Sequence, residues 1–164
     1  MTSISAGALA TTFTYDANGN QTSGAGLNIV YTSFNAAQSI TRGTTTITFD
    51  HDPEYQRYQQ VTPSGSTLYV SDSSGSGVRA ERFIGTGGTI QWSNYLFAGG
   101  ELVGVEIERT SEPTRLRYFH TDHLGSITAI TDESGAIVER LSYDSWGKRR
   151  HLNGAEDFAA MRAS

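Results

Sequence analysis

The sequence predicts an all-β, antiparallel fold, and three observations support this prediction. The chain of 164 residues contains 20 Thr, 18 Ser and 18 Gly, which favour strands and turns over helices. The pattern Asp-x-x-Gly recurs five times. Short runs rich in β-branched and aromatic residues lie between these patterns. Together the observations indicate a meander of hairpins.

The Asp-x-x-Gly pattern is typical of a type I turn. The Asp carboxylate accepts hydrogen bonds from nearby backbone N–H groups, and Gly in the fourth position tolerates a positive φ. We therefore expect turns at Asp16 to Gly19, Asp72 to Gly75, Asp122 to Gly125, Asp132 to Gly135 and Asp144 to Gly147.

Nine segments have the composition of strands. They are Leu27 to Tyr31, Thr44 to Phe49, Tyr55 to Val61, Val78 to Ile84, Thr89 to Phe97, Leu102 to Ile107, Leu116 to His120, Ser126 to Thr131 and Ala136 to Tyr143. Tight turns are also expected at Thr62 to Gly65 and at Ala98 to Gly100. A first strand is expected near Thr11 to Tyr15, and Ala155 to Arg162 has the pattern of a short helix or of a frayed terminus.

Neither face of these strands is uniformly apolar. Tyr118 and His120 alternate with Arg117 and Phe119, for example. This pattern favours a single-layer sheet with solvent on both sides, held by cross-strand pairs worth roughly 0.2–1 kcal/mol each.

Composition excludes several classes of protein. All but one of the 12 basic residues are Arg, the net charge is −5, and no basic stripe is present that could bind nucleic acid. Without cysteine the chain forms no disulfide and no thiolate site, but this is compatible with any compartment. No run of about 18 apolar residues predicts a membrane span, and the first ten residues do not resemble a signal peptide.

Tyr-Asp pairs accompany some of these turns. They occur at Tyr15-Asp16 and Tyr143-Asp144, with degenerate versions at Phe34-Asn35 and Phe49-Asp50. A more specific succession follows: Tyr95 to Val103 (YLFAGGELV), Tyr118 to Ser126 (YFHTDHLGS), Thr131 to Gly135 (TDESG) and Tyr143 to Gly147 (YDSWG). This succession resembles the RHS repeat-associated core of RHS/YD-repeat proteins, which include bacterial RHS toxins and the C components of Tc toxins.

The resemblance implies part of a β-shell, a hollow cocoon that houses a C-terminal effector. It implies degenerate YD repeats over residues 1–94, an RHS-core-like segment over 95–150 and a C-terminal tail over 151–164. The expected partners are the remaining shell repeats and the enclosed effector, in a secreted or cell-surface protein. The family continues to an Asp-Pro motif linked to self-cleavage; Asp52-Pro53 lies within a repeat, so that role is not transferred to it.

No residue is assigned to catalysis, to a cofactor or to a metal. His120, Asp122 and His123 form the one cluster that suggests a metal, but positions i and i+3 of a strand face opposite sides, and a turn cap at Asp122 is the simpler interpretation. Adjacency of Asp122, His123 and Ser126 is no evidence of a catalytic triad. Gly85 to Gly88 has no following Lys or helix and predicts a hairpin turn, not a phosphate loop.

Two further groups suggest contacts. Charged residues between 106 and 117 are interpreted as cross-strand pairs or as an interaction surface: Glu106, Glu108, Glu112, Arg109, Arg115 and Arg117. Trp92, Tyr95, Phe97 and Trp146 suggest either packing or a platform on which a sugar stacks.

From these points we expect a structural shell segment that is not an enzyme. The alternative is a cell-surface module that binds glycan or protein through exposed aromatic residues. Unprotected edge strands also predict self-association, or pairing with a strand from a partner.

Overall fold

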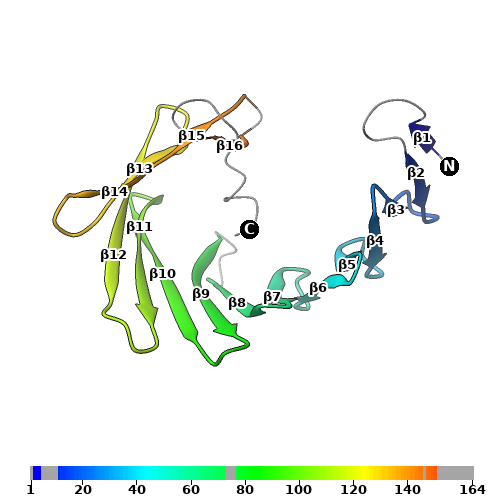
Figure 1. Cartoon of the computed structure of the whole chain (residues 1–164), viewed down its shortest axis with the longest axis horizontal. Helices are drawn as coiled ribbons and strands as arrows, with labels where there is room; N and C mark the ends of the chain where they lie inside the picture. Colours follow the sequence, from blue (N-terminus) through cyan, green and yellow to red (C-terminus); the bar gives the residue numbers. More distant parts are fainter. Residues whose placement is uncertain (1, 5–10, 73–76, 146, 151–164) are drawn as a thin grey trace. The chain divides into compact units, whose positions relative to one another are not determined.

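Figure 1 shows the computed structural model of the chain, which describes residues 2–4, 11–72, 77–145 and 147–150. Within these ranges every regular element is a strand, so the all-β prediction is confirmed. The chain divides into two compact units, residues 1–91 and 92–164. The helix expected at Ala155 to Arg162 lies outside the described residues. The division of the repeats between residues 94 and 95 stays a prediction.

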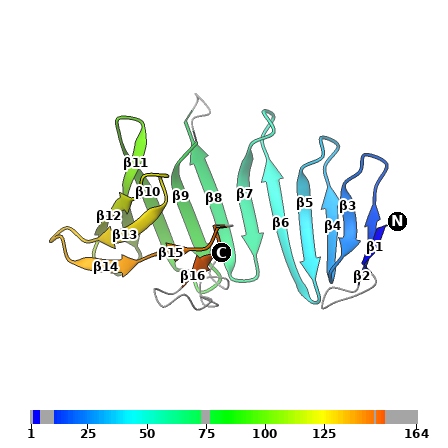
Figure 2. The ribbon, with the colours of Figure 1, turned by 90° about the horizontal axis from the view of Figure 1, so that it is seen from above.

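The first unit is an antiparallel meander in which each strand pairs with the next one in sequence. Figure 2 shows its strands side by side. The strands are β1 (Thr2–Ile4), β2 (Thr11–Tyr15), β3 (Gln21–Gly24), β4 (Leu27–Tyr31), β5 (Ala37–Arg42), β6 (Thr45–His51), β7 (Arg57–Thr62), β8 (Gly65–Ser71) and β9 (Val78–Gly85).

The second unit continues with longer hairpins of the same kind. Its strands are β10 (Ile90–Ala98), which begins at the unit boundary, β11 (Glu101–Arg109), β12 (Arg115–Thr121), β13 (Ile127–Thr131) and β14 (Ile137–Arg140). A separate two-stranded sheet pairs β15 (Ser142–Tyr143) with β16 (Arg149–Arg150).

Several predicted strands need correction. Ala136 to Tyr143 is not one strand, because β14 ends before Leu141, whose N–H donates to Thr128 O (2.9 Å). The expected first edge at Thr11 to Tyr15 is also wrong, since β1 pairs with it. Strands β1, β3, β5, β8 and β16 were not predicted.

The sheet has almost no core, as the sequence indicated. Among the described residues only two hydrophobic side chains are buried, Val105 (7% exposed) and Leu141 (9%), and no large side chain is fully buried. Stability must therefore come from backbone ladders and from cross-strand neighbours such as Ile29, Ile40 and Ile47, which lie in register on β4, β5 and β6.

The predicted turns recur with one geometry. At Asp16, Asp122, Asp132 and Asp144 the Gly three positions later donates its N–H to the Asp carbonyl (3.0–3.2 Å) and has a φ of 78–87°. These four predictions are confirmed, whereas the turn after Asp72 falls largely on residues 73–76, outside the described ranges. The tight turns at Thr62 to Gly65 and Ala98 to Gly100 and the hairpin turn at Gly85 to Gly88 are also confirmed.

Three further turns have the same geometry without the Asp-x-x-Gly motif: the hairpin turn at Gly85 to Gly88 and the two described next. Asn35 N–H donates to Thr32 O (3.1 Å), Tyr55 N–H donates to Asp52 O (3.0 Å), and both donor residues have a positive φ. Aligned on the turns, the counterparts of Tyr15-Asp16 are Tyr31-Thr32 and His51-Asp52. The assignment of Phe34-Asn35 and Phe49-Asp50 as degenerate repeat pairs was therefore wrong, because Phe34 lies within a turn and Phe49 within β6.

One extra residue follows the turns at Asp16, Thr32, Asp52, Asp122 and Asp132 at an equivalent place, and one also follows the motif at Asp72. The register slips by one residue between paired strands, so that a residue on the second strand stands opposite no partner of its own. The extra residues are Thr22, Gln38, Tyr58, Arg79, Thr128 and Val138. Such bulges increase local twist, so each hairpin imposes a similar bend on the sheet.

Candidate functional site

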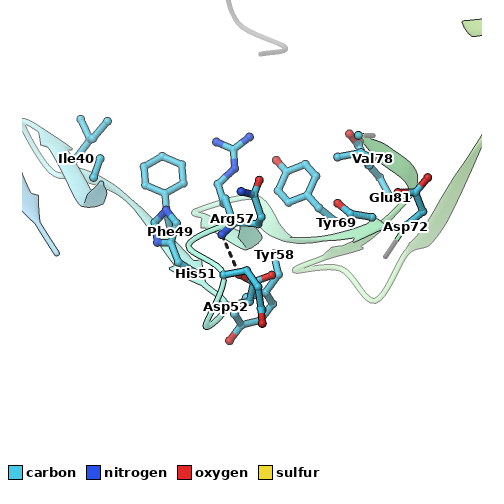
Figure 3. Close-up of a pocket in the computed structure, with 15 residues that line it drawn as sticks. Ile40, Phe49, His51, Asp52, Arg57, Tyr58, Tyr69, Asp72, Val78 and Glu81 are labelled. Atoms are coloured by element: carbon cyan, nitrogen blue, oxygen red, sulfur yellow. Dashed lines mark hydrogen bonds between the residues drawn. The ribbon is translucent and has the colours of Figure 1, made fainter. Parts of the chain in front are cut away.

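The first unit carries a hollow of about 1160 Å³ over strands β5 to β9. Figure 3 shows Phe49, Arg57 and Tyr69 side by side on the face that lines it. The guanidinium carbon of Arg57 lies 5.4 Å from the centroid of the Phe49 ring and 4.7 Å from that of Tyr69. Stacking on both rings holds the guanidinium plane in place by cation–π attraction.

Register explains why these side chains share a face. Phe49 is paired with Gln60, which is paired with Thr67, so the three lie in one row across β6, β7 and β8. Tyr69 is two positions beyond Thr67 on the same face, and its hydroxyl donates to Gln60 Oε1 (3.0 Å). The opposite face carries exposed residues such as Thr48 and Val61, which are also paired. The two faces of the sheet therefore differ in chemistry.

The turns of the first unit contact one another through side chains. Asn18 and Asn20 each donate an amide N–H to Asn35 Oδ1 (3.0 and 2.8 Å). In the next pair of turns the ring of Phe34 lies 4.6 Å from that of Tyr55, tilted by 42°, and 5.4 Å from the His51 ring, edge to face. These contacts link three successive hairpins at one end of their strands.

Asp carboxylates organise the backbone of the turns. Asp122 Oδ1 accepts the N–H groups of Leu124 (2.9 Å) and Ser126 (3.0 Å), as the sequence predicted for a cap. The Asn20 side-chain amide, together with backbone amides, holds the pKa of Asp16 below its ordinary value. The Ser134 hydroxyl, the amides of Ala136 and Ser134 and the charge of Arg117 lower the pKa of Asp132.

The structure separates the suspected metal cluster into two environments. His120 is on β12, and its Nε2 lies 3.0 Å from Thr131 Oγ1 on β13. His123 lies in the following turn, whose Asp122 carboxylate is bonded to backbone amides. Over the described parts of the chain no three His, Cys, Asp or Glu residues gather as a metal site would require. That the protein binds no metal stays a prediction.

The charged residues around the β11–β12 turn pair locally. Glu112 forms ion pairs with Arg109 (3.1 Å) and Arg115, and Arg117 lies 3.7 Å from Glu133. Glu106 and Glu108 instead accept long hydrogen bonds from Asn94 (3.4 Å each). Glu112 is paired as expected. Its partners Arg109 and Arg115 lie on either side of the same turn, so these ion pairs are contacts around a turn and not cross-strand pairs.

The suspected aromatic platform does not form one surface. Tyr95 and Phe97 are two positions apart on β10 and share one face, whereas Trp92 is an odd number of positions from both and lies on the other face. Trp146 lies outside the described residues. The pair of half-buried Phe34 and exposed Tyr55 was not singled out from the sequence. Tyr55 follows Asp52-Pro53, a dipeptide typical of turns, and stands where the other repeats have Gly. This replacement of Gly by Tyr is the sequence feature that could have revealed the pair.

No helix able to cross a membrane is found among the residues that the structure describes.

Comparison with known proteins links the fold to one group. Residues 116–153 match the family model described as RHS protein, whereas no curated protein matches. The chain is similar in structure to chains of the TcdB2–TccC3–TEV crystal structure and of the Photorhabdus luminescens Tc holotoxin pore with a TccC3 mutation. For each the TM-score is 0.64 and the identity 16%, over 82% of this chain and 7% of the other.

A third similar structure, TcdB2–TccC3–Cdc42, gives a TM-score of 0.62 at the same identity and coverage. This chain therefore spans 7% of the length of the chains that it resembles, and the likeness concerns the fold. The RHS segment lies over β12 to β16, where the repeat motifs YFHTDHLGS, TDESG and YDSWG stand. Residues 116–153 thus carry an RHS segment, as the sequence indicated, and the fold of the chain is similar to that of chains in Tc toxin structures.

Proposed function

We propose that the chain is a wall segment of an RHS-type β-shell that encloses or presents a C-terminal effector and is not itself catalytic. The observation that supports this most directly is the single-layer sheet with two different faces. A sheet without its own core is suited to separate two compartments, one on each side. The likeness to chains of Tc toxin assemblies supports a role as a toxin component.

In this proposal the face that lines the hollow over β5 to β9 is the inner face of the wall. Phe49 and Tyr69 offer apolar ring surface, while Thr48 and Val61 belong to the outer face. We further propose that the complete protein is secreted or displayed at the cell surface, that the other partners are neighbouring shell repeats, and that the edge strand β14 pairs with them.

Site-specific photo-crosslinking in the complete protein tests the proposal. A photoreactive amino acid replaces Tyr69 on the face of the hollow or, as the matched control, Val61 on the opposite face. We expect cross-links to the C-terminal effector from position 69 and none from position 61. Equal cross-linking from both positions, or none from position 69 in a folded protein, would contradict an enclosing wall.

Self-association is tested on the chain alone by sedimentation over a dilution series. We expect species larger than a monomer at high concentration, because an exposed edge strand pairs with other chains unless it is protected. A strictly monomeric, cooperatively folding chain at all concentrations would contradict the role of the edge.

A further inference from the structure

Arg57 is held between two aromatic rings but has no polar partner among the described residues. Its guanidinium carbon lies 5.4 Å from the centroid of the Phe49 ring and 4.7 Å from that of Tyr69. All three side chains rise from one face of the sheet (Figure 3). No hydrogen bond or ion pair joins the guanidinium to any residue that the structure describes. The rings therefore orient a cation whose N–H donors have no acceptor on this part of the chain.

The nearby carboxylates do not neutralise this cation. Asp72 is paired with Arg79 instead (2.6 Å). Glu81 stands opposite Tyr69 on β9, so it is two strands away from Arg57 on β7, a separation of roughly 10 Å at the usual strand spacing. Tyr69 belongs to β8, the strand between them. An acceptor for Arg57 other than water therefore comes from outside the described residues.

The guanidinium of Arg57 is prepared to bind an anion with two oxygens. Its planar group presents two parallel N–H donors, which match the oxygens of a carboxylate or a phosphate. Because the rings already restrict the side chain, binding costs little of its conformational freedom. The hollow of about 1160 Å³ leaves room beside Arg57 for a side chain of another segment.

The charge of the lining favours a carboxylate that is carried by a protein. Four carboxylates line the hollow together with Arg57: Asp52, Glu54, Asp72 and Glu81. Their field repels a freely diffusing phosphate, which has the larger charge, more strongly than it repels one carboxylate. A carboxylate on an enclosed chain is held nearby at high effective concentration, which offsets the remaining repulsion.

We propose that Arg57, held by Phe49 and Tyr69, binds the carboxylate of an aspartate or glutamate side chain in the enclosed effector. This site deepens the proposed wall function and rests on it for the identity of the partner. It gives the inner face one directional contact, whereas the rings alone would offer apolar surface without a preferred partner.

Arginine side-chain NMR on the full chain tests the affinity of Arg57 for a carboxylate. The probes are the acetylated and amidated tripeptide Ala-Glu-Ala, its Ala-Gln-Ala counterpart and inorganic phosphate. Arg140 is the matched control within the same sample, because it is also exposed and also makes no hydrogen bond or ion pair with a described residue.

We expect the Arg57 Nε–H signal to saturate with Ala-Glu-Ala at a concentration at least tenfold below that for Arg140. Neither signal should respond to Ala-Gln-Ala, and phosphate should bind Arg57 more weakly than Ala-Glu-Ala does. Phe49→Leu, which removes one of the two rings, should bring the response of Arg57 closer to that of Arg140. The comparison of the two arginines in the unaltered chain does not depend on the folding of this variant.

Cross-linking in the complete protein identifies the partner. A photoreactive amino acid replaces Ile40, which lines the hollow, and mass spectrometry identifies the effector peptide to which it attaches. We expect one dominant peptide that contains an aspartate or a glutamate. Arg57→Gln should replace this peptide by a dispersed set, and Arg140→Gln should leave it unchanged.

Three results would overturn the site and leave the wall function standing. They are equal responses of Arg57 and Arg140 to Ala-Glu-Ala, tighter binding of phosphate than of the tripeptide at Arg57, and cross-links from position 40 that Arg57→Gln does not change. The absence of any effector cross-link from positions 40 and 69 would instead overturn the wall function, and with it the effector as the partner of Arg57.

Discussion

The turns of the two units share a backbone geometry but are built from different residues. In the second unit the turns at Asp122, Asp132 and Asp144 have Asp as the cap and Gly at the positive-φ position. In the first unit Thr32 replaces one Asp, and Asn35 and Tyr55 replace Gly. Since a side chain at the positive-φ position can reach the neighbouring turn, the first unit accepts strain and gains contacts between hairpins, which Gly cannot make.

The largest effect should come from glycines that lie against backbone in either unit. A Cβ on Gly65 would overlap the Ile84 carbonyl oxygen, and one on Gly104 would overlap that of Arg117. Gly65→Ala and Gly104→Ala should each lower the free energy of unfolding by about 3 kcal/mol, at the upper end of overpacking costs. Urea denaturation measures this, with Gly87→Ala as the control because open space surrounds that position and its φ is not positive.

A second comparison exchanges the residues at the positive-φ position. Gly125→Val, Gly135→Val and Gly147→Val should each cost about 2 kcal/mol in urea denaturation, because a β-branched residue tolerates φ near 80° poorly. Asn35→Gly should change stability by less than about 0.5 kcal/mol, since the relief of φ offsets the lost bonds from Asn18 and Asn20. Three neutral Val variants would contradict the turn assignment.

A smaller effect is expected from the caps. Asp122 Oδ1 accepts two backbone amides, whereas Thr32 Oγ1 accepts one, from Ala36 (3.1 Å). Thermal unfolding should therefore show Asp122→Ala costing about 1 kcal/mol and Thr32→Ala about half of that. The reverse order would show that the charged cap has no advantage at these exposed turns.

The smallest expected effect is on how the stability of the fold depends on pH. The pKa values of Asp16 and Asp132 are lowered in the folded chain, so their carboxylates stabilise the fold above the ordinary Asp pKa of about 3.9. That contribution to stability is lost as the pH falls from about 3.9 through the lowered pKa values of these two carboxyl groups. Urea midpoints measured between pH 6 and 2 should show a weaker acid dependence in Asp16→Asn/Asp132→Asn, and an unchanged dependence would exclude these two groups as its source.

The sequence predicts turns better than strands in this protein. Asp and Gly have specific roles in the turns at Asp122 and Asp132, so the motif alone located them. Strands β3 and β5 escaped prediction because they are rich in Gln, Ser, Thr and Gly. A sheet with solvent on both faces does not require apolar alternation, and the usual strand signal is weak in these two strands. Strand β8 was missed although Thr67 to Val70 have the β-branched and aromatic residues typical of a strand.

Site residues were harder to predict, for a different reason. Arg57 lies between Phe49 and Tyr69 only because β6, β7 and β8 pair in one register. The contact between Phe34 and Tyr55 joins turns of different hairpins. Neither arrangement follows from spacing along the chain, since both depend on how neighbouring hairpins align.

The recurrence of one turn geometry also constrains how the length of such a chain can vary. The described turns of the first unit begin at Asp16, Thr32 and Asp52, and the Asp-x-x-Gly motif recurs at Asp72; each position lies an even number of residues after the one before. Because side chains along a strand alternate between faces, even spacing returns each turn to the same orientation. A pair of residues added to a strand would keep each side chain on its face, whereas a single residue that no bulge absorbs would exchange the two faces of the strands that follow. Natural length variation in this array should therefore occur in steps of two.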